Sequence, residues 1–149
     1  MASFSGGDKL QAKLKELADK IGSNSVSVGF LEDATYPTGQ SVAEVAAYNE
    51  FGTTKSPARP FFGNMVEANK DSWGDALGKL CVALDYDIPK VMGQMGEGIK
   101  GQLQQSIIDF NDPPDSDGTI ERKQSAHGAD ATLVDTGHML NSVDYEVKE

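Results

Sequence analysis

Only two segments of this chain alternate apolar and polar residues as β-strands do, and they lie far apart in the sequence. In residues 25–31 (SVSVGFL) two valines and a phenylalanine alternate with serines and a glycine, and residues 143–147 (VDYEV) alternate in the same way. Two strands are too few to form a stable sheet by themselves. We therefore expect either further strands within residues 32–40 or around 54–62, or neighbouring subunits that complete the sheet.

The remaining regular structure is predicted to be helical. Residues 8–21 place four large aliphatic side chains on one helical stripe, opposite lysines and acids. A serine–glutamate capping box at residues 41–44 predicts a second helix that ends near Gly52. Apolar residues then recur at helical spacing over residues 65–84 and again over residues 88–110, so two longer helices are expected there.

Residues 111–132 are the least core-like part of the chain, because they are polar and contain two prolines and two glycines. They are predicted to form a long mobile loop with at most one helical turn, at residues 119–124. After this loop, Asp135 or Thr136 can cap a short helix that leads into the last strand. The order of elements predicts an α+β fold: a single domain over residues 1–149, with a small twisted antiparallel sheet packed against helices.

The stretch YNEFGTTKSPARPFFGN, residues 48–64, places four aromatic residues around a polar segment. Its prolines disfavour helical angles in the residues before them, so the SPARP segment should form a stiff, extended arm. The two phenylalanines after it either pack on the chain's own core or dock on another chain, because aromatic residues and arginine are enriched at interface hot spots. The second interpretation predicts a subunit or partner interface made of Phe51, Pro57, Arg59, Pro60, Phe61 and Phe62. In that interface Arg59 would pair with a carboxylate or with backbone carbonyls of the neighbour.

The chain offers no convergent set of catalytic groups. His127 and His138 are far apart and stand outside metal-ligand spacings such as HExxH, and no phosphate-binding loop occurs. Cys81 is the only cysteine, which excludes an intramolecular disulfide and favours a small buried apolar residue. The acidic run at residues 109–117 has two prolines that break the spacing of a calcium loop, so a solvated linker is the better interpretation. We therefore expect no enzymatic activity, no cofactor and no bound metal.

Charge narrows the class of partner. Thirteen basic residues against twenty-three acidic ones give a net charge of −10, which argues against a dedicated nucleic-acid-binding protein. A negative wall repels phosphate, however, and would leave a DNA strand free to slide past it. No apolar stretch is long enough to span a membrane, and the first twenty residues lack the character of a signal peptide. We expect a soluble protein made in a reducing cytoplasm.

Three segments, in this order, resemble the neck or tail-completion proteins of long-tailed bacteriophages and prophages. They are VGFLEDATYPTGQSVAEVAAYNEFGT, then SPARPFF, then LVDTGHMLNSVDYEV near the C-terminal end. The resemblance covers most of residues 25–72 and 119–147, and the order and spacing of the segments carry it. The chain departs from the pattern at residues 63–64, where a basic residue and a proline are expected.

The resemblance implies a structural protein of the virion rather than an enzyme. Such a protein forms a ring at the head–tail junction, a hexamer or alternatively a dodecamer. Its expected partners are head-completion or connector proteins and tail-terminator or tail-tube proteins; genomic DNA passes nearby without specific binding, and no membrane is involved. It is made in the host bacterial cytoplasm. Two alternatives stay open: a tail terminator or minor tail protein that caps the tail tube, and a small acidic enzyme or nucleic-acid mimic that acts as a monomer.

Overall fold

The computed structural model describes residues 6–127, 132–134 and 137–149 of the chain. The order of elements is α1 (Gly7–Ser23), β1 (Ser25–Phe30), α2 (Val42–Phe51), α3 (Phe61–Ala83), α4 (Ile88–Asp109), α5 (Asp117–His127), α6 (His138–Asn141) and β2 (Val143–Lys148). Helices and a small antiparallel sheet together confirm the α+β prediction. No helix in the described ranges has both the length and the apolar character needed to cross a membrane.

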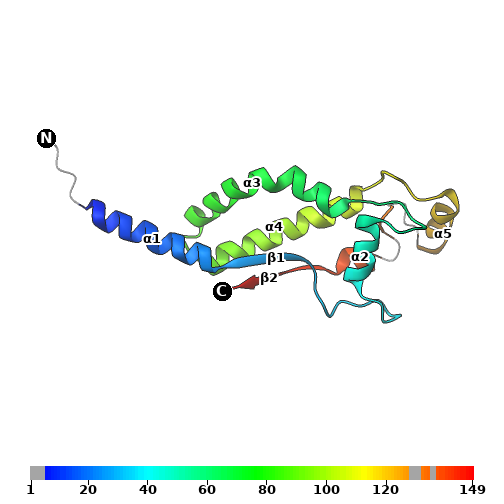
Figure 1. Ribbon diagram of the computed structural model, residues 1–149, viewed down its shortest axis with the longest axis horizontal. Coiled ribbons are helices and arrows are strands. Elements are labelled where there is room, and N and C mark those ends of the chain that lie inside the picture. Colours follow the sequence, from blue (N-terminus) through cyan, green and yellow to red (C-terminus); the bar gives the residue numbers. More distant parts are fainter. Residues whose placement is uncertain (1–5, 128–131, 135–136) are drawn as a thin grey trace.

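The two predicted strands pair with each other. β1 and β2 run antiparallel, in a register that places Ser25 opposite Lys148 and Phe30 opposite Val143. The expected additional strands are not found in the described residues, where residues 32–40 contribute only an isolated bridge between Thr35 and Ser41 and residues 54–60 are irregular. The strands are brought together because α4 packs on both of them and α3 covers α4, as Figure 1 shows.

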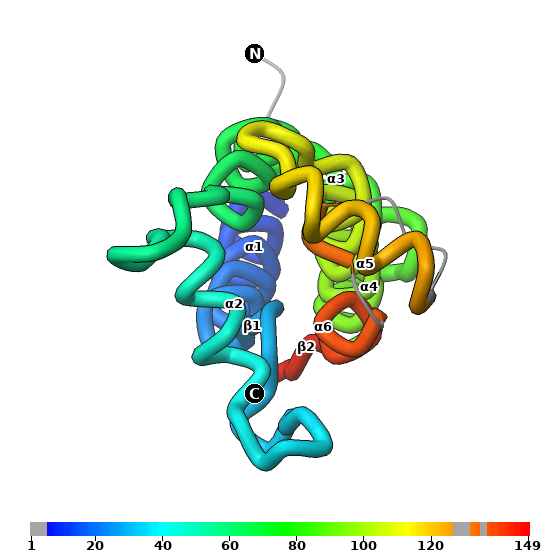
Figure 2. The backbone as a smooth tube through the Cα atoms, turned by 90° about the vertical axis from the view of Figure 1, so that its right-hand side faces the viewer, coloured from blue at the N-terminus to red at the C-terminus, as the bar shows by residue number. Residues whose placement is uncertain are grey.

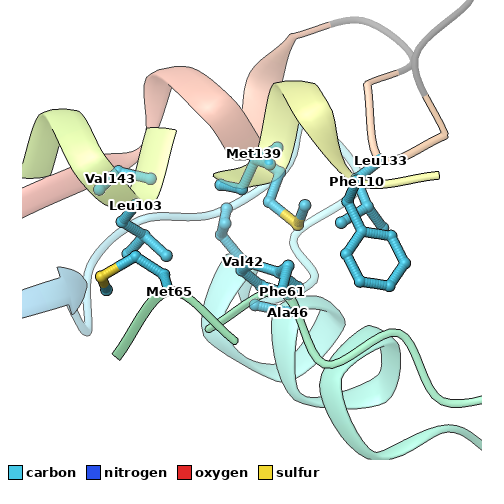
Figure 3. Close-up of a cluster of buried hydrophobic side chains, with 10 residues drawn as sticks. Val42, Ala46, Phe61, Met65, Leu103, Phe110, Leu133, Met139 and Val143 are labelled. Carbon is cyan, nitrogen blue, oxygen red and sulfur yellow. The ribbon is translucent and has the colours of Figure 1, made fainter. Parts of the chain in front are cut away.

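The main core lies where α2, α3, α4 and β2 meet. Figure 3 shows its buried side chains, which come from α2, α3, α4, α6, β2 and two residues outside the elements: Val42, Ala46, Phe61, Met65, Leu103, Ile107, Phe110, Leu133, Met139 and Val143. A second cluster at the other end of the α3–α4 pair contains the buried Cys81, as expected for a free cysteine in an apolar environment. Apolar residues along the single helix α4 therefore contribute to both clusters.

The close approach of α4 to the sheet depends on a glycine. A Cβ built at Gly96 would lie 2.3 Å from the Tyr145 ring of β2, which is closer than side chains can pack. Glycine thus replaces a side chain where the helix and the strand touch. Glycine lowers helix propensity, and at Gly96 its presence within α4 is explained by this close packing.

Two predictions about segments are wrong. Residues 111–132 were expected to form a loop with at most one helical turn, but they contain the eleven-residue helix α5. Residues 128–131 of that segment, and the proposed capping residues Asp135 and Thr136, lie outside the described residues. In addition, α3 begins at Phe61, four residues before the start of the helix expected over residues 65–84. Figure 2, seen along the long axis, shows α2 on one side of the molecule and α5 and α6 on the other.

The N-terminal helix is formed as predicted but remains largely uncovered. α1 has no buried residue, and it projects from the end of the sheet away from the rest of the molecule (Figure 1). Only Ile21, near its C-terminal end, joins a core cluster. The amphipathic pattern therefore predicted the helix correctly, although the apolar face has no covering element among the described residues.

Candidate interaction surface

The arm after α2 is held by backbone hydrogen bonds. Gly52 adopts a φ of 75°, and a Cβ at this position would lie 2.7 Å from the backbone nitrogen of Ala58, so glycine is required where the chain turns back. The Arg59 N–H then donates to the Asn49 carbonyl at 2.6 Å. The arm is therefore fixed against the C-terminal end of α2, with the exposed Pro57 at its outer side.

A carboxylate of α2 caps the N-terminus of α3. Glu50 accepts hydrogen bonds from the Phe62 N–H at 2.9 Å and the Gly63 N–H at 3.0 Å. These donors belong to the first turn of α3, whose amide groups have no partner within the helix. The negative charge also lies at the positive end of the helix dipole. Glu50 thus fixes the angle between α2 and α3.

Arg59 makes its observed contacts within its own chain, and its pairing with a neighbouring subunit stays a prediction. Its Nε donates to the Pro113 carbonyl at 3.3 Å and its Nη2 donates to the Pro114 carbonyl at 3.5 Å. The same Nη2 lies 3.3 Å from Asp115 Oδ1. The predicted chemistry, a carboxylate and backbone carbonyls, is the one observed; the segment that supplies it lies between α4 and α5.

Asp115 also binds a lysine from α5. Lys123 Nζ lies 2.7 Å from Asp115 Oδ2 and donates to the Thr132 carbonyl at 2.7 Å. The side chains of Arg59, Asp115 and Lys123, here called the Asp115 cluster, are only 13%, 10% and 6% exposed. The interpretation of residues 109–117 as a solvated linker is therefore wrong for Asp115, whose side chain is largely covered and lies between two cations.

The six predicted interface residues separate into two groups. Phe61 is 1% exposed in the main core, and Arg59 is engaged in the Asp115 cluster, so neither presents a free surface to a partner. Pro57 and Pro60 are exposed, and Phe62 is half-buried. Phe51 is 80% exposed at the end of α2 and stays a candidate contact residue. Sequence spacing cannot tell an aromatic side chain at a helix start that turns inward from one that turns outward.

Phe51 borders an apolar groove between α2, the start of α3 and the end of β1. The groove has a volume of about 300 Å³, and its lining is almost wholly apolar: Phe30, Ala43, Ala46, Ala47, Glu50, Phe51, Phe61, Phe62 and Gly63. The only charged lining residue, Glu50, is turned toward the α3 backbone that it caps. We call this feature the α2–α3 groove.

A second apolar surface runs along α1. Leu10, Leu14, Leu17 and Ile21, here called the α1 stripe, share one helical face, and the first two are 53% and 56% exposed. Two exposed leucines one turn apart on a projecting helix are unusual for a surface that faces only water. The sequence revealed the stripe, but whether it would be covered depended on the tertiary structure.

The described residues contain no group of three or more His, Cys, Asp or Glu side chains placed to hold a metal ion. A second hollow of about 870 Å³ is lined in part by Lys123 and His138. Both are engaged there: Lys123 with Asp115, and His138 through Nε2 with the Thr35 carbonyl at 2.8 Å. The surfaces that stand out are thus apolar contact surfaces.

Comparisons of the chain with protein-family models, with curated proteins and with solved structures found no significant match.

Proposed function

We propose that this protein is a structural component of a bacteriophage virion and acts at the head–tail junction. Copies of the chain form a ring, a hexamer or alternatively a dodecamer, that helps to complete the tail and to join it to the DNA-filled head. The three resembling sequence segments point to this class of protein. The observation that carries the proposal is the α1 stripe on a projecting helix, because its first two leucines, Leu10 and Leu14, are 53% and 56% exposed.

The sheet supports the same proposal. It has two strands, so each strand has an outer edge that pairs with no other strand in the described residues. An open edge offers unpaired N–H and C=O groups to a strand from another chain. A sheet this small gains stability when a neighbouring subunit extends it, which is the second of the two expectations drawn from the sequence.

Net charge is compatible with a position beside DNA. A chain with a net charge of −10 repels phosphate, and a ring of such chains multiplies that charge around its opening. Genomic DNA therefore passes without specific binding. The remaining partners in this proposal are head-completion or connector proteins on one side and tail-terminator or tail-tube proteins on the other. The protein is made in the bacterial cytoplasm and acts in the virion, without enzymatic activity or a cofactor.

Deleting the gene from its phage and imaging the particles by electron microscopy tests this function. The neck role predicts filled heads and finished tails that are not joined, and joining should return when the wild-type chain is supplied from a plasmid. Unfinished tails would instead favour the alternative role, a tail terminator or minor tail protein that caps the tube. Normal, infectious particles without the protein would contradict both roles.

A further inference from the structure

We infer that α1 of one copy binds in the α2–α3 groove of the next copy, so that the two exposed apolar surfaces form one contact between subunits. The inference deepens the proposed function and rests on it for the identity of the partner, a second copy of this chain. It names the surfaces through which the ring would close.

The two surfaces cannot meet within one chain. In Figure 1, α1 lies at one end of the long axis, beyond the sheet, and α2 lies near the other end. A contact between them must therefore join different copies. Because it uses two different surfaces, the contact is heterologous, and repeated heterologous contacts produce a closed ring when the rotation between copies allows closure.

The form of the α1 stripe suits a preformed groove better than a second α1. Its residues follow one another at spacings of four, three and four, which is the pattern by which an amphipathic helix binds in an apolar groove. The stripe spans twelve residues, fewer than two heptads. Sustained coiled coils need about three to four heptads, so two α1 helices offer each other too short a seam. The α2–α3 groove is already formed, with Phe51 exposed along its rim.

The charges beside the two surfaces are opposite. α1 carries four lysines and three acids, whereas α2 carries two glutamates and no basic residue. At 100° per residue, Lys9, Lys13 and Lys20 all fall on one flank of the α1 stripe. Glu44 falls on the flank of α2 that carries Phe51. This complementarity selects a second copy as the occupant of the groove, because the same chain supplies both the basic flank of α1 and the acidic flank of α2 beside the apolar groove.

The existing partners of these lysines do not prevent such a contact. Glu16 lies 3.2 Å from Lys13 Nζ and 2.9 Å from Lys20 Nζ, and these hydrogen bonds, first that of Lys20, hold the Glu16 pKa below its ordinary value. All three side chains are about half exposed or more. Exposed pairs of this kind contribute little, so the lysines can turn to a neighbouring carboxylate at small cost.

Disulfide trapping between copies of the full-length chain tests the inference. One chain carries Leu14→Cys, the other carries Phe51→Cys with a size tag, and concentrated equal mixtures are oxidised and separated on a non-reducing gel. The expected result is a larger yield of the mixed dimer, relative to the two like dimers, than random pairing of the two chains would give. A mixture with Val82→Cys in place of Leu14→Cys, at an exposed position on α3, is the matched control and should give only background. The wild-type chain, with its buried Cys81, measures that background.

Two results would overturn the inference: a Leu14→Cys dimer with itself as the main product, which means α1–α1 pairing, or no mixed product above the Val82→Cys control. The yield of mixed product should also fall as salt rises toward about 1 M, where the Debye length is only about 3 Å. Because the trap uses the isolated protein, it is separable from the proposed function. Mixed product from a protein absent from virions would remove the function alone, and a virion protein that yields no mixed product would remove the inference alone.

Discussion

Replacing Asp115 with alanine should destabilise the protein more than any single substitution on its surface. Asp115 lies between Arg59 Nη2 at 3.3 Å and Lys123 Nζ at 2.7 Å, and all three side chains are at most 13% exposed. Asp115→Ala leaves both cations in place without their shared carboxylate. Removing one partner of a buried ion pair costs more than the pair contributes, because an uncompensated charge stays behind in a poorly solvated site.

The magnitude follows from the distances. With an effective dielectric constant of about 20, charges at these separations attract each other by roughly 5 and 6 kcal/mol, most of which is offset by the desolvation of the three groups. The net cost of Asp115→Ala is therefore expected at about 3–5 kcal/mol. Arg59→Ala should cost less, about 1.5–3 kcal/mol, because Asp115 then keeps Lys123.

Urea unfolding followed by circular dichroism measures the effect. With an m-value of about 2 kcal/mol/M, the Asp115→Ala midpoint should fall by roughly 1.5–2.5 M. Glu121→Ala removes an exposed carboxylate from α5, the helix that supplies Lys123, and is the control, with an expected change within about 0.5 kcal/mol. Hydrogen exchange should increase first in α5, which the Asp115 cluster ties to the arm. A midpoint shift for Asp115→Ala no larger than that for Glu121→Ala would mean that the Asp115 carboxylate contributes little to stability.

Three further substitutions test separate features of the fold. Glu50→Ala leaves the amide donors at the start of α3 without their cap and should lower the free energy of unfolding by about 1–2 kcal/mol in urea titrations, with little change indicating that water replaces the cap. Gly96→Ala should cost about 1–3 kcal/mol of stability, because the added Cβ would clash with the Tyr145 ring. Gly93→Ala, on the same helix, places its Cβ in open space and should stabilise the protein by up to about 1 kcal/mol. Equal effects of the two variants in thermal unfolding would disprove the close approach of α4 to Tyr145. The Asp144 pKa is lowered, chiefly because its carboxylate accepts a hydrogen bond from the backbone N–H of the next residue. The ionised carboxylate therefore stabilises the fold above the ordinary aspartate pKa, and this contribution is lost as the pH falls. Asp144→Asn should flatten that part of a stability–pH profile, and an unchanged slope would exclude this role.

Local patterns in the sequence predicted the elements that depend on local physics. Ser41 caps α2 as expected, with its side chain accepting from the Glu44 N–H at 3.4 Å, and the alternation of residues 25–31 and 143–147 identified both strands. Such features are encoded within a few residues of the chain. They were therefore readable before any tertiary contact was known.

The features that were missed depend on partners distant in sequence. The sequence does not identify Glu50 as the cap of α3, because the backbone N–H groups that it binds, of Phe62 and Gly63, follow an arm without regular secondary structure. The polar sequence of α5 is typical of a loop, so the helix is not predicted. The ion pair between its buried Lys123 and Asp115 cannot be identified from a hydrophobicity pattern. The sequence leaves open whether Phe61 packs on its own core or docks on another chain, because its burial depends on α4 and β1 and not on its neighbours in sequence.

The proposal that copies of this chain form a ring at the head–tail junction is tested most directly by cryo-electron microscopy of that junction in intact particles. The expected result is a ring of copies around the DNA path, with α1 of each copy lying against Phe51 of the next. A junction fully accounted for by other chains, with this protein absent from the particle, would contradict it.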